Sequence, residues 1–477
     1  MKLFDLALFP ALTMACFGVL AHALFLAGSV VPSWTLPACA AMAALWLVWR
    51  PFSVSAVDRS PASRTILVAS VVLVLGIVVW ASWTSCITPD RSWDGLVSWT
   101  LRAEALGAPA DLSKAFFKQP EVFAHSRAYP LLQPGLLALL GDLLGQQTAR
   151  LLFPFLFLSL FVLILATARR MGVSWNASLV LATAFSITPG YLDVGAGAID
   201  SGYGDLCLAY AVALGAAGLL LEDSMLLFLA CLLLPWIKPE GTAYAILIAA
   251  CLVLGSNKHN LRAAAGGLGI AFLLWLPLRA RLSFAPTTLS WLPGLLVLGL
   301  FPAVQELFGR WCRGRVKWLL LGCLALGLAL AAFLGRSALL QSTDPLLRDF
   351  ASHLGDAVQR IPSLPAMLLG WGSALVTFKA VGFAFVLLIP AFFLSRDRLE
   401  VGGRRLWAFL LIALGLFFVA LLLSPEHDVA HELRSRLSRL LLQIVPVAWL
   451  LVVQAWALLP GDTLTSQLPA GEGPHPR

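Results

Sequence analysis

Arginine side chains gather where the last long apolar run of the chain begins. Arg436 and Arg439 lie three residues apart in RSRLSRLLLQIVP, so they would share one face of a helix. Two guanidinium groups at a lipid–water boundary suit a phosphate, which they bind through bidentate hydrogen bonds. Alternatively, the arginines only form exposed ion pairs with the acidic residues of the preceding segment, SPEHDVAHE. This alternative is weakest for Arg439, which lies a turn into the apolar run.

Carboxylates lie in an earlier segment, DRSWDGLVSW, which contains Asp90 and Asp94 beside Trp93 and Trp99. A carboxylate next to aromatic side chains, just beyond a helix end, can have a raised pKa and act as a general base. Alternatively, Asp90 or Asp94 caps the helix that follows. The residues alone slightly favour the cap and leave both roles open.

Other charged residues interrupt apolar sequence. In GAIDSGYGDLCLAY, Asp200 and Asp205 precede or open an apolar run, where capping and the helix dipole also explain them. In PWIKPEGTAY, Lys238 and Glu240 lie between two short apolar runs, and their simplest role is to pair with each other. Lys379, in ALVTFKAVGF, lies deep within an apolar run, and an ionisable residue inside a membrane is a functional candidate by default.

Histidines give only a weak metal signal. His427 and His431 are four residues apart beside acidic residues, a spacing that can hold a metal, but no third convincing ligand accompanies them. A solvated loop explains them more simply, and His125 is isolated in the sequence. We predict no metal and no cofactor. The sequence also has no nucleophile elbow, phosphate-binding loop or dinucleotide-binding loop in the required context.

The composition places these residues in a membrane protein. The chain has 477 residues, of which 60% are hydrophobic and 12% charged, with a mean hydropathy of +0.87. A soluble domain has about 25% charged residues, so lipid must be the main solvent here. The net charge of +8 does not indicate nucleic-acid binding, because lysine and arginine lie in short loops between apolar runs.

The apolar runs predict about fourteen membrane-spanning helices. They are residues 4–29, 34–50, 65–84, 149–168, 176–190, 205–221, 224–237, 241–256, 263–280, 288–308, 318–334, 372–394, 406–423 and 438–458. With both termini inside, five basic loops fall on the inner side, as the positive-inside rule requires. Those loops contain Arg50, Arg59 and Arg64; Arg169 and Arg170; Lys258 and Arg262; Arg310, Arg313, Arg315 and Lys317; and Arg396, Arg398, Arg404 and Arg405.

This topology divides the chain into six regions. They are N-terminal spans (1–84), a first outer segment (85–148), a bundle of spans (149–334), a second outer segment (335–371), C-terminal spans with the arginine segment (372–459) and a disordered inner tail (460–477). The first outer segment contains two amphipathic stretches, WDGLVSWTLRAEAL and YPLLQPGLLALLGDLLG. The second is short for a span, and we predict a helix that lies on the outer interface or dips into it.

These segments together resemble a known family. WDGLVSWTLRAEAL followed by HSRAYPLLQPGL resembles the first outer loop of GT-C-fold glycosyltransferases, including bacterial relatives of protein O-mannosyltransferases and of the lipid A aminoarabinose transferase. Similar segments follow in the family's order: RLLFPFLFLSLFVLILATARRMG, SGYGDLCLAY, WIKPEGTAY and SRLSRLLLQIVP. The resemblance covers residues 85–250 and 424–450. The extra spans before the first outer loop depart from the commonest pattern of the family.

The resemblance implies an inverting enzyme of the bacterial inner membrane. It would transfer a sugar from a polyprenyl-phosphate donor to a glycan, lipid or protein acceptor on the periplasmic side. Asp94 matches the family's loop aspartate and would deprotonate the acceptor. The implied donor-phosphate residues are Arg439, Arg436, Lys238 and Lys379. The implied sugar-binding residues are Asp90, Arg102, His125, Tyr129, Asp205 and Glu240.

Three other functions remain open at this point. A transporter or flippase of lipid-linked glycans would place its essential charges along a path through the bilayer, whereas here they gather on one predicted side. A scaffold in an envelope-assembly complex would tolerate substitution of Asp94. A ligase or polymerase using a polyprenyl diphosphate would need similar arginines and could use His427 or His431 as its base.

Overall fold

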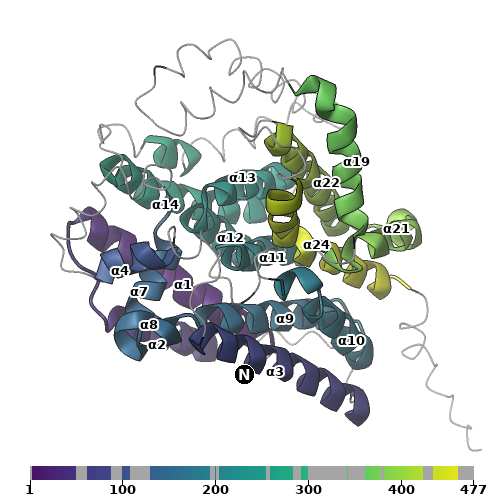
Figure 1. Ribbon diagram of the computed structural model, residues 1–477, viewed down its shortest axis with the longest axis horizontal. Coiled ribbons are helices and arrows are strands. Elements are labelled where there is room, and N and C mark those ends of the chain that lie inside the picture. The colour runs from purple at the N-terminus through teal and green to yellow at the C-terminus, as the bar shows by residue number, and fades with distance from the viewer. Residues whose placement is uncertain are drawn as a thin grey trace, which may run out of the picture.

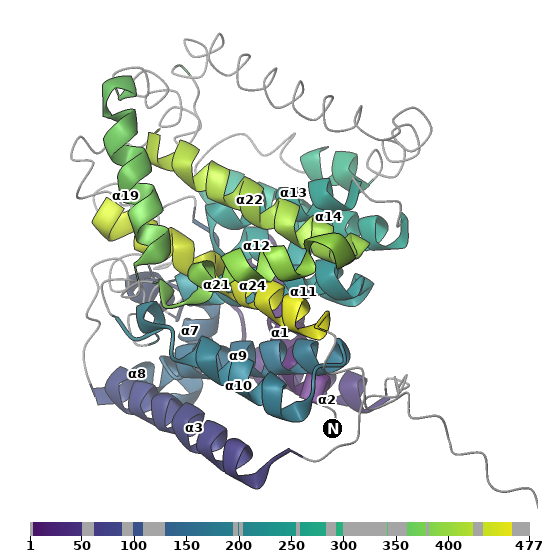
Figure 2. The same cartoon turned by 90° about the vertical axis from the view of Figure 1, so that its right-hand side faces the viewer.

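The structure is a computed structural model that describes residues 3–49, 62–87, 99–107, 129–193, 199, 204–253, 258–282, 292–298, 341, 360–377, 381–422 and 433–459. Every regular element within these ranges is a helix. Figure 1 shows them as a bundle with α11 near its middle and α3 along its lower edge. Figure 2, turned by 90°, again places α3 at the edge, beside α9 and α10.

The helices follow the chain in this order. The first part contains α1 (Leu3–Leu26), α2 (Thr35–Trp49), α3 (Arg64–Ile87), α4 (Leu101–Gly107), α7 (Leu132–Leu144), α8 (Gln146–Ala149), α9 (Leu152–Arg170) and α10 (Trp175–Ser186). The second part contains α11 (Asp205–Leu221), α12 (Ser224–Ile237), α13 (Pro239–Val253), α14 (Lys258–Leu282), α19 (Leu364–Val376), α21 (Ala384–Ser395), α22 (Val401–Leu422) and α24 (Ser438–Ala457).

Many of these helices have the length and composition of membrane spans. Within the described ranges, six are long and apolar enough to cross a bilayer: Leu3–Leu26, Arg64–Ile87, Gln146–Arg170, Lys258–Ala280, Val401–Leu422 and Ser438–Ala457. Shorter apolar helices are α2, α7, α11, α12, α13 and α19. These helices agree with the α-helical membrane protein that the composition predicts.

Burial differs sharply between the edge and the middle of the bundle. On α3, apolar side chains such as Val68, Val72 and Val79 are exposed, a pattern that suits contact with lipid. On α11, every residue from Asp205 to Leu219 is buried. This central helix packs against α9, α12 and α24. Buried polar side chains from these helices therefore meet at the two ends of α11.

The junction between α12 and α13 is sharply turned. Lys238 has an extended backbone (φ −149°, ψ 158°) and ends α12, and Pro239 begins α13, where a missing N–H costs nothing. At Gly241 a side chain would collide with the carbonyl of Leu234, so only glycine allows this close approach. The turn leaves Lys238 between the two helices, facing the start of α11.

One predicted span is wrong. Residues 372–394 form no single helix, because α19 ends at Val376 and α21 begins only at Ala384. Thr377 has an extended ψ of 112°, and Gly382 adopts a positive φ of 61° that only glycine tolerates easily. Thr377 and Gly382 therefore lie between two separate apolar helices, and α19 extends into the region predicted as the second outer segment.

The second amphipathic stretch is helical, as predicted. It forms α7, whose residues from Leu132 to Leu139 are buried. This helix packs against α1, α4, α8 and α12. The reason is compositional, because α7 is apolar on nearly all sides and so gains by burial in protein on more than one face.

A polar cluster lies at the C-terminal end of α11. Glu222 has a left-handed backbone (φ 52°) and binds the buried Arg405 of α22 at 2.8 Å. Its carbonyl accepts from Asn260 of α14, and the neighbouring Asp223 binds Arg170 of α9 at 2.8 Å. The cluster therefore joins α9, α11, α14 and α22.

We expect Glu222→Gln to lower the free energy of unfolding by about 1–2 kcal/mol, because Arg405 would keep a buried charge without its carboxylate. The decrease in the free energy of unfolding is smaller than for a fully buried pair, since the Glu222 side chain is 42% exposed. The midpoint of thermal unfolding of purified protein in detergent measures this decrease. Asp397→Asn, in an exposed pair with Arg396, serves as the control and should leave the midpoint unchanged. Equal midpoints for Glu222→Gln and wild type would show that the pair does not stabilise the bundle.

Candidate functional site

The candidate site is centred on the carboxylate of Asp205. This residue opens α11, follows Gly204 at the N-cap, and has a side chain that is only 1% exposed. The positive end of the helix dipole favours a negative charge at this position. The dipole alone does not offset the loss of hydration of a buried carboxylate, so Asp205 needs charged or hydrogen-bonding partners.

Two cations supply that compensation. Lys238 places Nζ 2.8 Å from Oδ1 of Asp205, and Arg439 places Nε 3.0 Å from Oδ2. Burial acts to lower the pKa of Lys238, but the carboxylates of Asp205 and Glu240 raise it above its ordinary value. The neighbouring carboxylates therefore favour the charged form of Lys238. Together the three side chains connect the start of α11, the α12–α13 turn and the first turn of α24.

An amide and a phenol complete the network. Gln443, one turn after Arg439, donates from Nε2 to Oδ1 of Asp205 at 2.6 Å. Its Oε1 accepts from the hydroxyl of Tyr244 at 2.8 Å. A carboxylate accepts only, so this pair of contacts fixes the orientation of the Gln443 amide. The hydroxyl of Tyr191 also donates to the carbonyl of Leu442, which anchors α24 at this level.

The sequence prediction that Lys238 and Glu240 pair with each other is wrong in the structure. Lys238 turns toward α11 and binds Asp205, because the extended backbone before Pro239 directs its side chain away from the start of α13. Glu240 is partly buried at the start of α13, and its Oε2 makes no hydrogen bond with the residues that the structure describes.

A second group of predicted residues lies beside this network. The buried Arg102 of α4 donates to the carbonyl of Tyr129 at 3.3 Å, and its guanidinium lies 5.9 Å from the centre of the Tyr129 ring. Trp99 and Tyr129 also contact each other, with ring centres 6.1 Å apart. A side chain at Gly204 would lie 2.8 Å from the Trp99 ring, so this group packs directly on the residue that precedes Asp205.

Arg436 and Arg439 have different surroundings. Leu433–Leu437 forms a π-helical turn before α24, and there Arg436 is exposed. Arg439 is 19% exposed and bound to Asp205. Arg439 thus combines a fixed position with access to the exterior, which suits a group that must meet a ligand.

The structure brings Asp205, Lys238 and Arg439 together and places Arg102 and Tyr129 beside them. Four predicted site residues lie outside the described residues: Asp90, Asp94, His125 and Lys379. Sequence reasoning missed Gln443 and Tyr244. The available signal was the polar Gln443 one helical turn after Arg439 within an otherwise apolar run.

No metal-binding cluster of His, Cys, Asp and Glu occurs in the part of the chain that the structure describes. No family model, no curated protein and no solved structure matches this chain. The proposed function therefore rests on the geometry of the site and on the sequence pattern.

Proposed function

We propose that the chain is an inverting membrane glycosyltransferase that takes a sugar from a polyprenyl-phosphate donor. The observation that carries this proposal is the convergence of Lys238 and Arg439 on one buried carboxylate, where α12 ends and α11 and α24 begin. Ionisable groups in a membrane-embedded bundle are costly and are retained mainly for function. A GT-C-like bundle of about fourteen spans, with its site on the periplasmic side, belongs to the same proposal.

Asp205 acts in this proposal as a positioning residue. Its two oxygens accept from Lys238, Gln443 and Arg439, so it holds both cations in place. The cations then face the donor phosphate, whose negative charge grows as the sugar leaves. Preorganised charges that need not move during the reaction are often the largest catalytic contribution.

The transfer step forms one bond and breaks another. The acceptor hydroxyl oxygen attacks the anomeric carbon of the sugar, and the bond from that carbon to the phosphate oxygen breaks. The electron pair stays on the phosphate oxygen, and the acceptor proton passes to Asp94. In the sequence, Asp94 lies five residues before Trp99, whose ring packs against Gly204.

We expect Asp94→Asn to lower the rate of sugar transfer by about 10²–10⁴-fold, the range for loss of a general base. Purified protein would be supplied with polyprenyl-phosphate sugars and envelope extract, and released polyprenyl phosphate would be quantified. Asp142→Asn is the control, because it removes an exposed carboxylate of the same predicted outer segment to which no role in transfer is assigned. Equal rates for wild type and Asp94→Asn would make Asp94 a helix cap and assign the base elsewhere.

A further inference from the structure

The side-chain amide of Gln443 is bonded at both ends. Its Nε2 donates to Oδ1 of Asp205 at 2.6 Å, and its Oε1 accepts from the hydroxyl of Tyr244 at 2.8 Å. Gln443 is 1% exposed and Tyr244 is 4% exposed, so the surrounding helices enclose both groups. The hydroxyl of Tyr244 therefore holds the amide oxygen of Gln443 toward α13.

Tyr244 is itself held in place by α22. The centre of its ring lies 6.2 Å from the ring centres of Phe409 and Phe417. Phe409 stacks on the tyrosine ring, and Phe417 meets it edge to face. Both arrangements are favourable for aromatic rings, so this packing fixes the direction in which the hydroxyl points.

Arg439 lies one helical turn before Gln443. Side chains four residues apart on a helix share one face, and a guanidinium carries five N–H donors. Arg439 binds Oδ2 of Asp205 through Nε at 3.0 Å and is 19% exposed. A buried amide oxygen without a donor is costly. If Tyr244 lost its hydroxyl, the guanidinium of Arg439 would be a donor within reach of the Gln443 oxygen.

Such a contact would change what Arg439 can do. A guanidinium bound to Gln443 turns toward its own helix, whereas the proposed reaction needs it to face the phosphate of the donor. A small displacement of a group that must meet the substrate is enough to slow a reaction.

We propose that Tyr244 is a positioning residue of the donor-phosphate site, where its hydroxyl holds the amide oxygen of Gln443 away from the guanidinium of Arg439. This inference rests on the proposed function, because that function assigns Arg439 to the donor phosphate. Tyr244 acts through Gln443 and not by contact with the substrate.

The first measurement is the initial rate of polyprenyl-phosphate release by full-length protein at saturating donor. Tyr244→Phe removes only the hydroxyl and should lower kcat about twofold to tenfold, the range for one hydrogen bond. Adding Gln443→Leu removes the amide that would bind Arg439, so this double variant should be faster than Tyr244→Phe alone. With p-aminophenylalanine in place of Tyr244, a donor returns at the same position, and kcat should return to the wild-type value.

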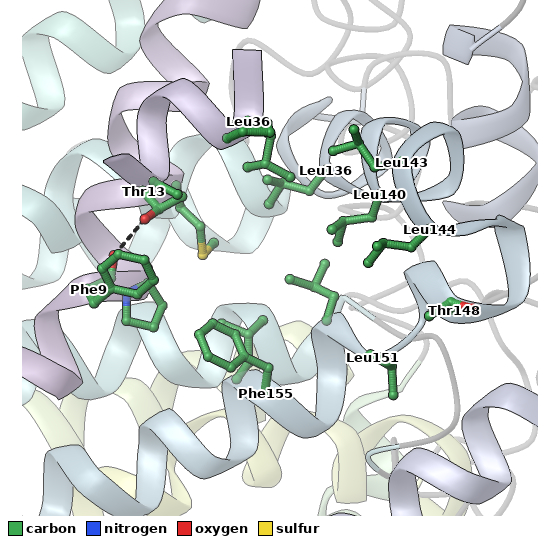
Figure 3. A pocket seen from close by; sticks show the side chains of 16 residues that line it. Phe9, Thr13, Leu36, Leu136, Leu140, Leu143, Leu144, Thr148, Leu151 and Phe155 are labelled. Atoms are coloured by element: carbon green, nitrogen blue, oxygen red, sulfur yellow. Dashed lines mark hydrogen bonds between the residues drawn. The ribbon is translucent and has the colours of Figure 1, made fainter. Parts of the chain in front are cut away.

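Two controls remove a hydroxyl elsewhere in the bundle. Tyr210→Phe removes a buried phenol hydroxyl that donates to the carbonyl of Ala7 at 2.6 Å. Thr13→Val acts on an apolar groove of about 450 Å³ between α1, α2, α7 and α9, where the Thr13 hydroxyl donates to the carbonyl of Phe9 at 2.9 Å (Figure 3). Neither hydroxyl binds a residue of the Asp205 network, so both controls should transfer sugar at the wild-type rate.

The second measurement reports the position of Arg439 without turnover. Phenylglyoxal modifies accessible guanidinium groups, and peptide mass spectrometry gives the rate of modification at residue 439. In Tyr244→Phe this rate should fall about twofold to tenfold, because Gln443 binds the guanidinium. It should return to the wild-type value in the double variant and with p-aminophenylalanine in place of Tyr244.

A wild-type rate of modification at Arg439 in Tyr244→Phe would overturn the proposal. So would a double variant that is no faster than Tyr244→Phe, because Tyr244 would then contribute packing only. If wild type transfers no sugar but the modification rates change as expected, the proposed function fails and Tyr244 still positions Arg439. If wild type transfers sugar and the modification rates do not change, only this inference fails.

Discussion

Arg439→Gln is expected to lower kcat for sugar transfer by about 10²–10³-fold, the effect of removing one preorganised charge from a developing anion. Arg439 is bound to Asp205 through Nε and remains 19% exposed, so its guanidinium is held where a phosphate can approach. Glutamine keeps much of the length and some hydrogen bonding but loses the charge. Initial rates of polyprenyl-phosphate release at saturating donor measure the effect.

Two further variants show whether the effect comes from the charge at position 439. Arg439→Lys should recover part of the rate, because it restores the charge without the planar, bidentate group. Arg404→Gln removes an exposed arginine of α22 and should transfer sugar at the wild-type rate. A wild-type rate for Arg439→Gln would remove Arg439 from the phosphate site, whatever the two controls show.

Asp205→Asn is expected to lower the free energy of unfolding by about 3–5 kcal/mol, the effect of breaking a buried ion pair from one side. Lys238 and Gln443 both donate to Oδ1, and Arg439 donates to Oδ2. A neutral amide removes the charged carboxylate that both the buried Lys238 and the neighbouring Arg439 bind. Chemical or thermal unfolding in detergent measures the change, with Asp142→Asn on the exposed side of α7 as the control.

A double variant separates charge imbalance from simple loss of packing. Lys238→Met removes one of the two cations, so Asp205→Asn combined with Lys238→Met should be more stable than Asp205→Asn alone. If the two losses instead add, the stabilisation attributed to the ion pair comes from packing, and Asp205 does not hold the cations by charge.

Composition and apolar runs were enough to predict most of the helices in the part of the chain that the structure describes. Asp205–Leu221 and Ser224–Ile237 begin and end at the predicted residues, because a charged or capping residue marks each boundary. At the start of α12, for example, Asp223 accepts from the amides of Met225 and Leu226. Residues 372–394 were mispredicted since hydropathy averages over a short polar break, and the break depends on backbone angles at Thr377 and Gly382.

The residues of the site were easier to predict from the sequence than the contacts between them. Asp205, Lys238 and Arg439 stand out because each interrupts apolar sequence. Asp205 lies 33 residues from Lys238 and 234 residues from Arg439, so their contacts depend on how α11, α12 and α24 pack. Local sequence instead favoured a pair between Lys238 and Glu240. Gln443 was missed because a single amide one turn after Arg439 is a weak signal until its neighbours in the fold are known.

The most direct test of the central claim follows the fate of a labelled donor in proteoliposomes. Wild-type protein would be reconstituted with polyprenyl-phosphate sugars labelled in the sugar, together with envelope lipids as acceptors. If the protein is an inverting glycosyltransferase, label moves to an acceptor, with inverted configuration at the anomeric carbon, while polyprenyl phosphate accumulates in equal amount. Labelled donor that crosses the bilayer intact, with no polyprenyl phosphate formed, would contradict the account and identify the protein as a transporter.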